Sequence, residues 1–200
     1  MYSPRSFMVE NPDFIREFIS QHPFAILFSP DGHITHLPVN KYSDGRLYAH
    51  CARANPHARL ENGTAVTAVF SGPHAYISPD YYLTDFNVPT WNYSAVHCHA
   101  IINYVDDAAE SWRLFSEMVA IYEGPDGWHL PAEQRYRDLL SGIRFFEFSH
   151  PKFEAKLKFN QNKSAEDVAS VIANLHKTNP AAAGMMLMAN NELRADETGN

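Results

Sequence analysis

Residues 24–51, FAILFSPDGHITHLPVNKYSDGRLYAHC, are the stretch that decides the fold class. Three runs rich in apolar and β-branched residues, 24–29, 33–39 and 46–51, are separated by two Asp-Gly pairs. An Asp-Gly pair between two such runs is typical of a tight turn, because glycine readily adopts the positive φ that these turns need. We therefore expect an antiparallel three-stranded meander here.

The flanking sequence predicts more strands and several helices. The Asn11-Pro12 pair predicts the start of a helix, and apolar residues spaced by 3.6 predict further helices. These further helices begin near Asp107, Pro131 and Ser164. Additional strands are expected at 65–70, 76–78, 91–104, 143–148 and 153–159.

Two connections between these strands carry their own expectations. Gly72-Pro73 should interrupt the sheet, and the runs 143–148 and 153–159 should pair as a hairpin. Six or more strands with inserted helices predict one mainly β (α+β) domain of barrel-like form. We place this domain at residues 1–180 and expect a weakly helical or disordered tail at 181–200.

The composition is that of a folded protein. Of the 200 residues, 45% are hydrophobic and 20% are charged, which excludes a wholly disordered chain. The apolar runs are short and broken by polar residues, so we expect neither a secretion signal nor membrane association. Cys51 and Cys98 are too few for a disulfide framework, which favours a reducing, cytoplasmic location.

The net charge restricts the partners. Sixteen Lys and Arg residues against 23 Asp and Glu residues give −7, with an isoelectric point near 5.8. This is the wrong overall sign for an obvious nucleic-acid binder, although a local basic patch stays compatible with it.

A first candidate site lies where the strand ending near His50 leads into a helix start. Such a junction exposes backbone N–H groups, and Arg53 adds a guanidinium suited to phosphate. In the alternative interpretation, Asn55 only caps the helix and Arg53 forms a surface ion pair.

A second candidate site has the same logic near the other end of the chain. Lys158, Gln161, Asn162 and Lys163 lie between a strand and the helix that starts at Ser164. Ammonium and amide groups beside free backbone donors favour a phosphate or the edge of a heteroaromatic ring. The alternative is a polar turn that Ser164 caps.

Two further patterns are weaker. The Pro- and aromatic-rich segments 72–79 and 88–93, with Trp91 in the second, fit either the wall of a pocket for a flat ligand or ordinary core packing. His97 and His99 share one strand face, but no second cluster with metal spacing accompanies them, so we expect no metal. The motifs of nucleophile-elbow hydrolases, P-loop proteins, zinc proteases and dinucleotide-binding folds are absent from the sequence.

Taken together, these ordered motifs resemble the PaiB family of FMN-binding negative transcriptional regulators of bacteria. The motifs are Thr35-His36-Leu37-Pro38, 50–56, 72–79, Val88-Pro89-Thr90-Trp91-Asn92-Tyr93 and 158–164. The resemblance covers residues 1 to about 180. It implies a split β-barrel of the FMN-binding type, usually a homodimer with two flavin sites at the subunit interface.

The resemblance also implies roles for particular residues. Arg53 and Asn55 match the turn that binds the FMN phosphate, although Ala54 stands where the superfamily's oxidases carry a second cation. The residues expected beside the isoalloxazine or closing the site, partly from the other subunit, are Thr35, His36, Leu37, His50, Trp91, Lys158, Gln161, Asn162 and Lys163.

The leading hypothesis is therefore a cytoplasmic, homodimeric FMN-binding regulator that represses transcription, with direct DNA contact left open. One alternative is a flavin-dependent oxidoreductase acting on a small molecule, for which the sequence indicates no catalytic residue. Another is a flavin-free or haem-binding interaction module on the same fold, with histidines as axial ligands.

Overall fold

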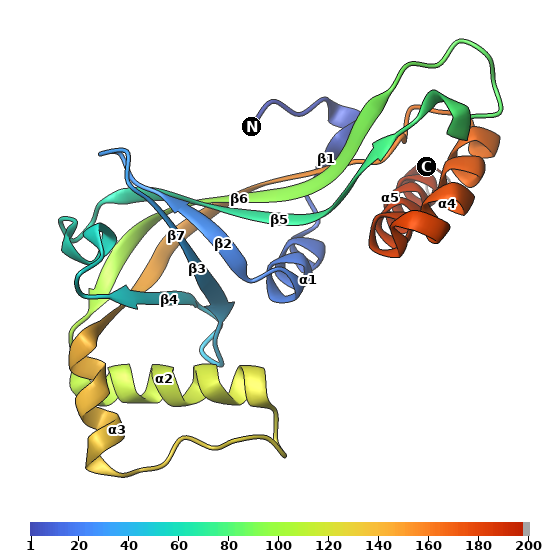
Figure 1. The fold of residues 1–200 in the computed structure, drawn as a ribbon. Coiled ribbons are helices and arrows are strands. Elements are labelled where there is room, and N and C mark those ends of the chain that lie inside the picture. The colour runs from blue at the N-terminus through green and yellow to red at the C-terminus, as the bar shows by residue number, and fades with distance from the viewer. Residues whose placement is uncertain (198–200) are drawn as a thin grey trace. The chain divides into compact units, whose positions relative to one another are not determined.

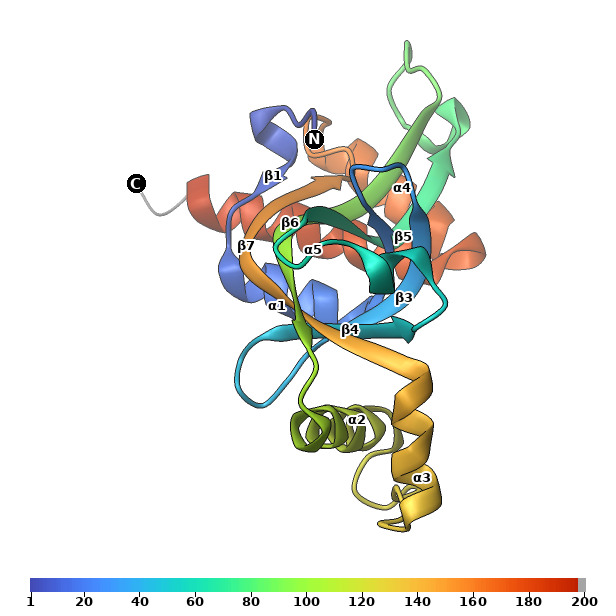
Figure 2. The ribbon, with the colours of Figure 1, turned by 90° about the vertical axis from the view of Figure 1, so that its left-hand side faces the viewer.

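The fold is a β-barrel with helices inserted between and after its strands. The computed structural model describes residues 1–197, with side chains up to Asn191 (Figure 1). The strands are β1 (Met8–Val9), β2 (Phe24–Phe28), β3 (Ile34–Lys41), β4 (Leu47–Ala52), β5 (Ala65–Ile77), β6 (Thr90–Val105) and β7 (Ile143–Lys158). They form one sheet in the order β1-β7-β4-β3-β2-β5-β6, and pairing of β6 with β7 closes six of them into a barrel (Figure 2). The mainly β, barrel-like fold with inserted helices is thus confirmed.

Several helices follow the capping signals of the sequence, whereas the helix expected to open at Pro131 begins only at Gln134. They are α1 (Pro12–Gln21), α2 (Ala108–Glu123), α3 (Gln134–Asp138), α4 (Ala165–Thr178) and α5 (Pro180–Glu197), with short 3-10 turns η1 (Arg5–Phe7), η2 (Pro56–Arg59), η3 (Pro79–Tyr81) and η4 (Leu139–Gly142). Asp107 and Ser164 cap α2 and α4 by accepting hydrogen bonds from the backbone N–H groups of Glu110 and Asp167. Among the described residues, no helix is both long and apolar enough to cross a membrane.

The predicted meander is present. β2 pairs antiparallel with β3, and β3 pairs antiparallel with β4. Gly32 and Gly45 occupy the two turns with φ of 84° and 83°, values that glycine adopts without steric cost. The Asp-Gly pairs therefore act as the sequence indicates.

Two strands are longer than expected. β5 runs through Gly72-Pro73 without a break, and its register with β2 covers only residues 67–69. Beyond that register, β5 has a strand edge on its β2 side, where proline's missing N–H is tolerated. The runs expected to form a hairpin are the single strand β7, in which His150 takes a φ of 52° at the predicted break and the strand then continues.

The chain divides into two compact units. The barrel unit comprises residues 16–70 and 97–153, and the helical unit comprises 1–15, 71–96 and 154 onward. In the barrel unit, α2 lies beneath β4 (Figure 2) and inserts Leu114 among Tyr42, Tyr48 and Phe145. Through this cluster, the apolar stripe of α2 packs against side chains of the strands.

In the helical unit, α4 and α5 pack against each other. The most deeply buried side chains of α5 are Ala182, Ala183, Met186 and Ala189. The Asn190 side chain donates hydrogen bonds to the backbone oxygens of Phe159 and Met186. Within the tail 181–200, which we expected to be weakly helical or disordered, the described part belongs to helix α5, and residues 198–200 lie outside the described residues. Small side chains and a flexible methionine allow the close packing of this helix.

Two neighbouring residues of α5 test how firmly this helix is integrated. Met186 is fully buried and Leu187 is 48% exposed. We expect Met186→Ala to lower the free energy of unfolding by about 2–5 kcal/mol through the cavity it leaves. Leu187→Ala should change it by less than about 0.5 kcal/mol. Urea unfolding followed by circular dichroism measures both, and equal effects would contradict the packing described.

Candidate functional site

A polar cluster in the barrel unit joins β3 to the turn η2. Asn55 caps η2, its Oδ1 accepting a hydrogen bond of 2.9 Å from the backbone N–H of His57, and Pro56 provides the fixed φ of a helix start. Thr35 of β3 places its Oγ1 3.2 Å from Asn55 Oδ1 and 2.8 Å from His57 Nδ1. We call Thr35, Asn55 and His57 the barrel cluster.

Two further residues hold η2 in place. The Tyr104 hydroxyl donates to the backbone oxygen of His57 at 2.7 Å, and Arg144 donates to that of Ala58 at 2.9 Å. The Arg144 guanidinium also lies 3.6 Å from the centre of the Tyr104 ring and pairs with Asp106 through two hydrogen bonds. The turn is therefore clamped on its carbonyl side.

The hydrogen-bond inventory of the barrel cluster is incomplete. Thr35 has one hydroxyl hydrogen for two neighbours, so it donates to Asn55 Oδ1 or to His57 Nδ1. His57 is fully buried, and its Nε2 has no hydrogen-bond partner among the described residues. Burial lowers the pKa of His57 in spite of the opposing effect of the nearby Asp31 carboxylate, so the ring is neutral near pH 7. A buried, unsatisfied imidazole nitrogen is a position where a polar ligand group adds stability.

Arg53 lies on the rim of a pocket of about 500 Å³ in the same unit. Its side chain is exposed, and its charge helps to lower the pKa of Asp106, which is held down mainly by the hydrogen bonds from Arg144. Across this pocket, the Arg137 guanidinium lies 4.2 Å from the centre of the Trp112 ring. Because Asp106 already pairs with Arg144, the positive charge of the Arg53 guanidinium stays available for binding an external anion.

The other predicted strand residues have different environments. The register of β3 with β4 runs from Lys41↔Leu47 to Val39↔Ala49, so Thr35 and His36 lie beyond it. His36 is exposed, whereas Leu37 is only 3% exposed and points into the core. His50 is half-buried with its ring 4.9 Å from that of Phe145, and burial lowers its pKa. Because the Leu37 side chain is buried, this residue can contact a ligand only through its backbone.

The helical unit contains the late candidates. Lys158 Nζ donates to Thr90 Oγ1 at 2.5 Å and to the backbone oxygen of Trp91 at 3.0 Å. Lys163 Nζ donates to Asn87 Oδ1 at 2.6 Å. These hydrogen bonds end on neutral oxygens, so neither ammonium is neutralised by them. We call Lys158 and Lys163 the lysine pair.

The remaining candidates in the helical unit, Gln161, Asn162 and Trp91, differ in their contacts and exposure. Gln161 is engaged by its own turn, accepting from the backbone N–H of Phe159 and donating to the backbone oxygen of Leu157. Asn162 is exposed. Trp91 is 52% exposed and stacks on His74 at 5.8 Å, with Tyr76 at 6.2 Å. The two aromatic segments of the sequence therefore do meet and form a flat, half-open wall.

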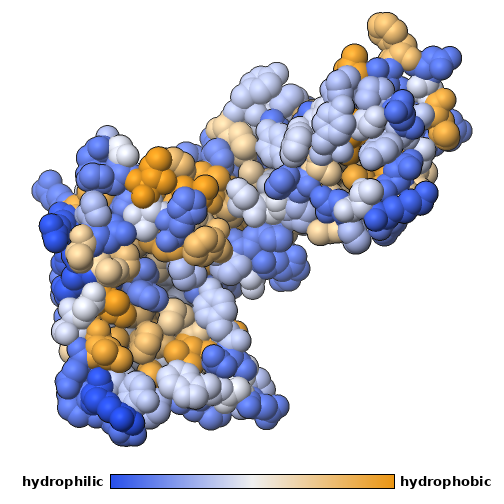
Figure 3. Space-filling view, viewed as in Figure 1, coloured by the Kyte–Doolittle hydropathy of each residue, from blue (hydrophilic) through white to orange (hydrophobic). Residues whose placement is uncertain are grey.

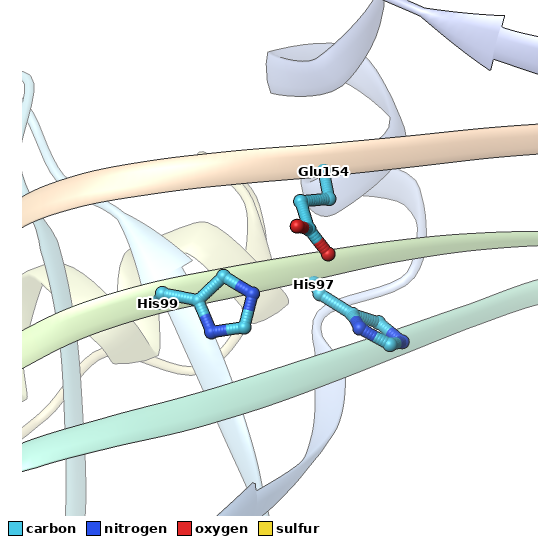
Figure 4. Close-up of side chains that lie close together, drawn as sticks. All are labelled: His97, His99 and Glu154. Atoms are coloured by element: carbon cyan, nitrogen blue, oxygen red, sulfur yellow. The ribbon is translucent and has the colours of Figure 1, made fainter. Parts of the chain in front are cut away.

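The cysteines and the paired histidines follow the strand alternation. His97 and His99 lie on one face of β6 with ring centres 6.3 Å apart (Figure 4), and Thr67 Oγ1 lies 3.0 Å from His99 Nδ1. Cys98 points to the opposite, buried side. Burial raises the pKa of Cys51 to about 11 and that of Cys98 to about 12, so both are protonated thiols.

Sequence reasoning missed several of these residues. His57 was detectable, because it stands two positions after the capping Asn55 in an Asn-Pro-His run. Thr90 and Asn87, which hold the lysine pair, and Arg144, which clamps η2, carry no local signal. Their partners lie 68, 76 and 86 positions away in the sequence.

Solved structures with the same fold include flavin-binding proteins. The flavocytochrome Anf3 of Azotobacter vinelandii has a TM-score of 0.62 at 14% identity, over 84% of this chain and 78% of that one. The FAD and heme binding protein of Mycobacterium smegmatis has a TM-score of 0.58 at 13% identity, over 82% and 79%. The fold is thus the split β-barrel of flavin-binding proteins, as predicted.

Sequence comparison narrows this class to a family. The family model described as "Putative FMN-binding domain" matches residues 1–149. Protease synthase and sporulation protein PAI 2 of Bacillus subtilis is 32% identical over 205 aligned positions, covering 97% of this chain and 99% of that protein. The chain belongs to the PaiB family of FMN-binding-domain proteins.

The barrel cluster predicts a pH dependence of stability. The folded-state pKa of His57 lies below the ordinary 6.5, so the unfolded chain binds more protons as the pH falls. The stability that comes from the neutral ring is fully present above pH 6.5 and is lost as the pH falls below this value. We expect His57→Gln to reduce the loss of stability between about pH 7.5 and about pH 5.5.

Urea midpoints at the two pH values measure this slope. The matched control is His129→Gln, which changes an exposed histidine of the same unit and should leave the slope as in the unaltered protein. An unaltered slope in His57→Gln would show that this ring is not held neutral by the fold.

Proposed function

We propose that this protein is an FMN-binding regulatory protein that works as a cytoplasmic homodimer. One observation carries the proposal: in a chain of the FMN-binding-domain family, β4 leads into a turn that combines an exposed Arg53 with the incompletely hydrogen-bonded barrel cluster. Such a junction offers a cation, backbone donors and a buried polar atom to one anionic ligand.

The residues fit the two ends of FMN. Arg53 and the η2 turn capped by Asn55 would hold the phosphate, and Thr35, His36, the backbone of Leu37 and His50 would lie beside the ring. Trp91 and the lysine pair, with the exposed Asn162 and the turn shaped by Gln161, would close the site from the second copy. The bound flavin supplies electron-accepting chemistry, while the chain's own residues supply binding and orientation.

The regulatory part of the proposal is supported by family membership. The relative in Bacillus subtilis is called a protease synthase and sporulation protein. Sporulation, which this name mentions, is a process that a cell switches on and off. With a net charge of −7, the chain is poorly suited to contact many DNA phosphates. We therefore propose that it represses transcription through a small-molecule signal or another protein.

Alanine at Arg53 tests the placement of the phosphate. Arg53→Ala should weaken FMN binding by about 1.5–3 kcal/mol, or roughly 10- to 150-fold in Kd, because a charge-assisted hydrogen bond is lost. Flavin fluorescence titration of the purified full chain gives the Kd. Arg59→Ala, which removes an exposed arginine at the end of the same turn, is the control and should bind FMN normally.

Lys158→Ala should weaken FMN by a similar factor if the second copy closes the site. Unchanged affinity in both Arg53→Ala and Lys158→Ala would overturn this placement of the phosphate. A Kd for FMN in the unaltered chain too weak to measure would overturn the flavin proposal itself.

Direct DNA binding has its own test. A gel-shift titration with promoter fragments at moderate salt should show no specific shift at micromolar dimer, because the acidic chain repels the duplex. A shift that survives competitor DNA would instead establish a direct repressor.

A further inference from the structure

The loop between β5 and β6 exposes large apolar side chains. Leu83 is 69% exposed, Val88 is 70% exposed and Phe86 is exposed completely. In Figure 3, hydrophobic residues gather at the tip of this loop. Single exposed apolar residues are ordinary, but three within six positions of one loop mark a surface that is used for binding. We call residues 82–90 the apolar loop.

The apolar loop is held in one shape. Asp167 of α4 accepts hydrogen bonds from the backbone N–H groups of Leu83 and Thr84 and from the Thr84 hydroxyl, at 2.7–3.1 Å. Asn87 donates to the backbone oxygen of Thr84 and accepts from Lys163. Phe86 sits at the tip with a φ of 66°, a left-handed conformation that is uncommon for an aromatic residue. A fully exposed aromatic residue that a fixed loop holds in a strained conformation is suited to contact a partner molecule.

The barrel unit contains an apolar groove without an occupant from its own described residues. Its volume is about 540 Å³, which is enough for several side chains. Phe28 and Ile101 line it and are each more than a third exposed. The complete lining is Phe28, Ser29, Pro30, Ala65, Val66, Thr67, His99, Ala100, Ile101, His150 and Lys152.

We propose that the apolar loop of one copy docks in this groove of a second copy, and that the second copy returns its loop to the first. The proposal rests on the proposed homodimer and identifies its interface. A two-fold arrangement satisfies both loops and both grooves at once and leaves no open end for further growth.

Charge complementarity favours a second copy as the occupant. Asp85 is exposed beside Phe86 at the loop tip, while Lys152 and His150 are exposed at the groove. An acidic tip also fits poorly against an anionic membrane surface. The loop thus brings an aromatic anchor and a negative charge to a groove that offers apolar walls and a positive charge.

Docking of the loop has a consequence for the flavin site. The apolar loop carries Asn87 and Thr90, to which the lysine pair donates its hydrogen bonds. The loop that enters the partner therefore carries Lys158 and Lys163 with it.

A charge exchange tests the interface. Sedimentation of the unaltered chain should show a dimer, and Asp85→Lys and Lys152→Glu should each raise the dimer dissociation constant about tenfold or more by placing like charges together. The chain that carries both changes should recover dimerisation, since the pair is restored with reversed sign. Leu139→Ser, at a residue that is 64% exposed and lies outside both surfaces, is the control and should stay dimeric.

Disulfide formation between engineered cysteines tests directly whether the loop and the groove are in contact. Phe86→Cys mixed with Ile101→Cys should form an intermolecular disulfide under mild oxidation, whereas Phe86→Cys mixed with Leu139→Cys should not. The native thiols do not interfere, because both are buried.

The outcomes separate this inference from the proposals on which it rests. A monomeric unaltered chain overturns the homodimer and this interface together. A dimer that withstands both charge reversals and gives no mixed disulfide overturns only the interface. If Lys152→Glu lowers FMN affinity while dimerisation is unchanged, the groove is a flavin pocket and the inference is wrong.

Discussion

The closure of the barrel by β7 is the constraint on which the rest of the structure depends. β7 pairs with β4 from Tyr48↔Glu147 to Ala52↔Ile143 and also pairs with β6. This double pairing leaves the barrel without an open edge in this region. It also fixes Arg144, at the start of β7, where the guanidinium reaches Asp106, Tyr104 and the carbonyl of Ala58. The barrel cluster is therefore positioned by a strand more than eighty residues further along the chain.

Most of the fold was predictable because it is governed by local chemistry. The Asp-Gly turns at Gly32 and Gly45 and the caps at Asp107 and Ser164 act over a few residues, and each was found where the sequence indicates it. The unbroken β5 and β7 were not predicted. At Pro73 and His150 the sequence favours a break, and neighbouring strands override this preference through pairing that no local pattern reports. Only weak helicity was expected in the region of α5, because its apolar pattern is weak and its packing against α4 and the Phe159 carbonyl depends on long-range contacts.

The candidate site was predictable in residue type more than in arrangement. The junction at Arg53 and Asn55 was predictable because a strand that leads into a turn has a recognisable sequence, and the structure shows β4 leading into η2 there. The clamp on η2 and the acceptors of the lysine pair depend on long-range contacts and stayed hidden. Side-chain direction was also hidden at Leu37, which alternates into the core next to an exposed His36. A motif indicates candidate residues for a site, and only the strand register shows whether the side chain or the backbone of each one is accessible.

The burial of the two cysteine thiols sets how fast they react with oxidants. Peroxides and alkylating agents react with thiolates, and a sulfur that is buried and protonated is a slow target for them. Cys51 and Cys98 meet both conditions. Oxidants and alkylating agents in the surroundings therefore react only slowly with the two cysteines, and a response to cellular redox state has to enter by another route than these thiols.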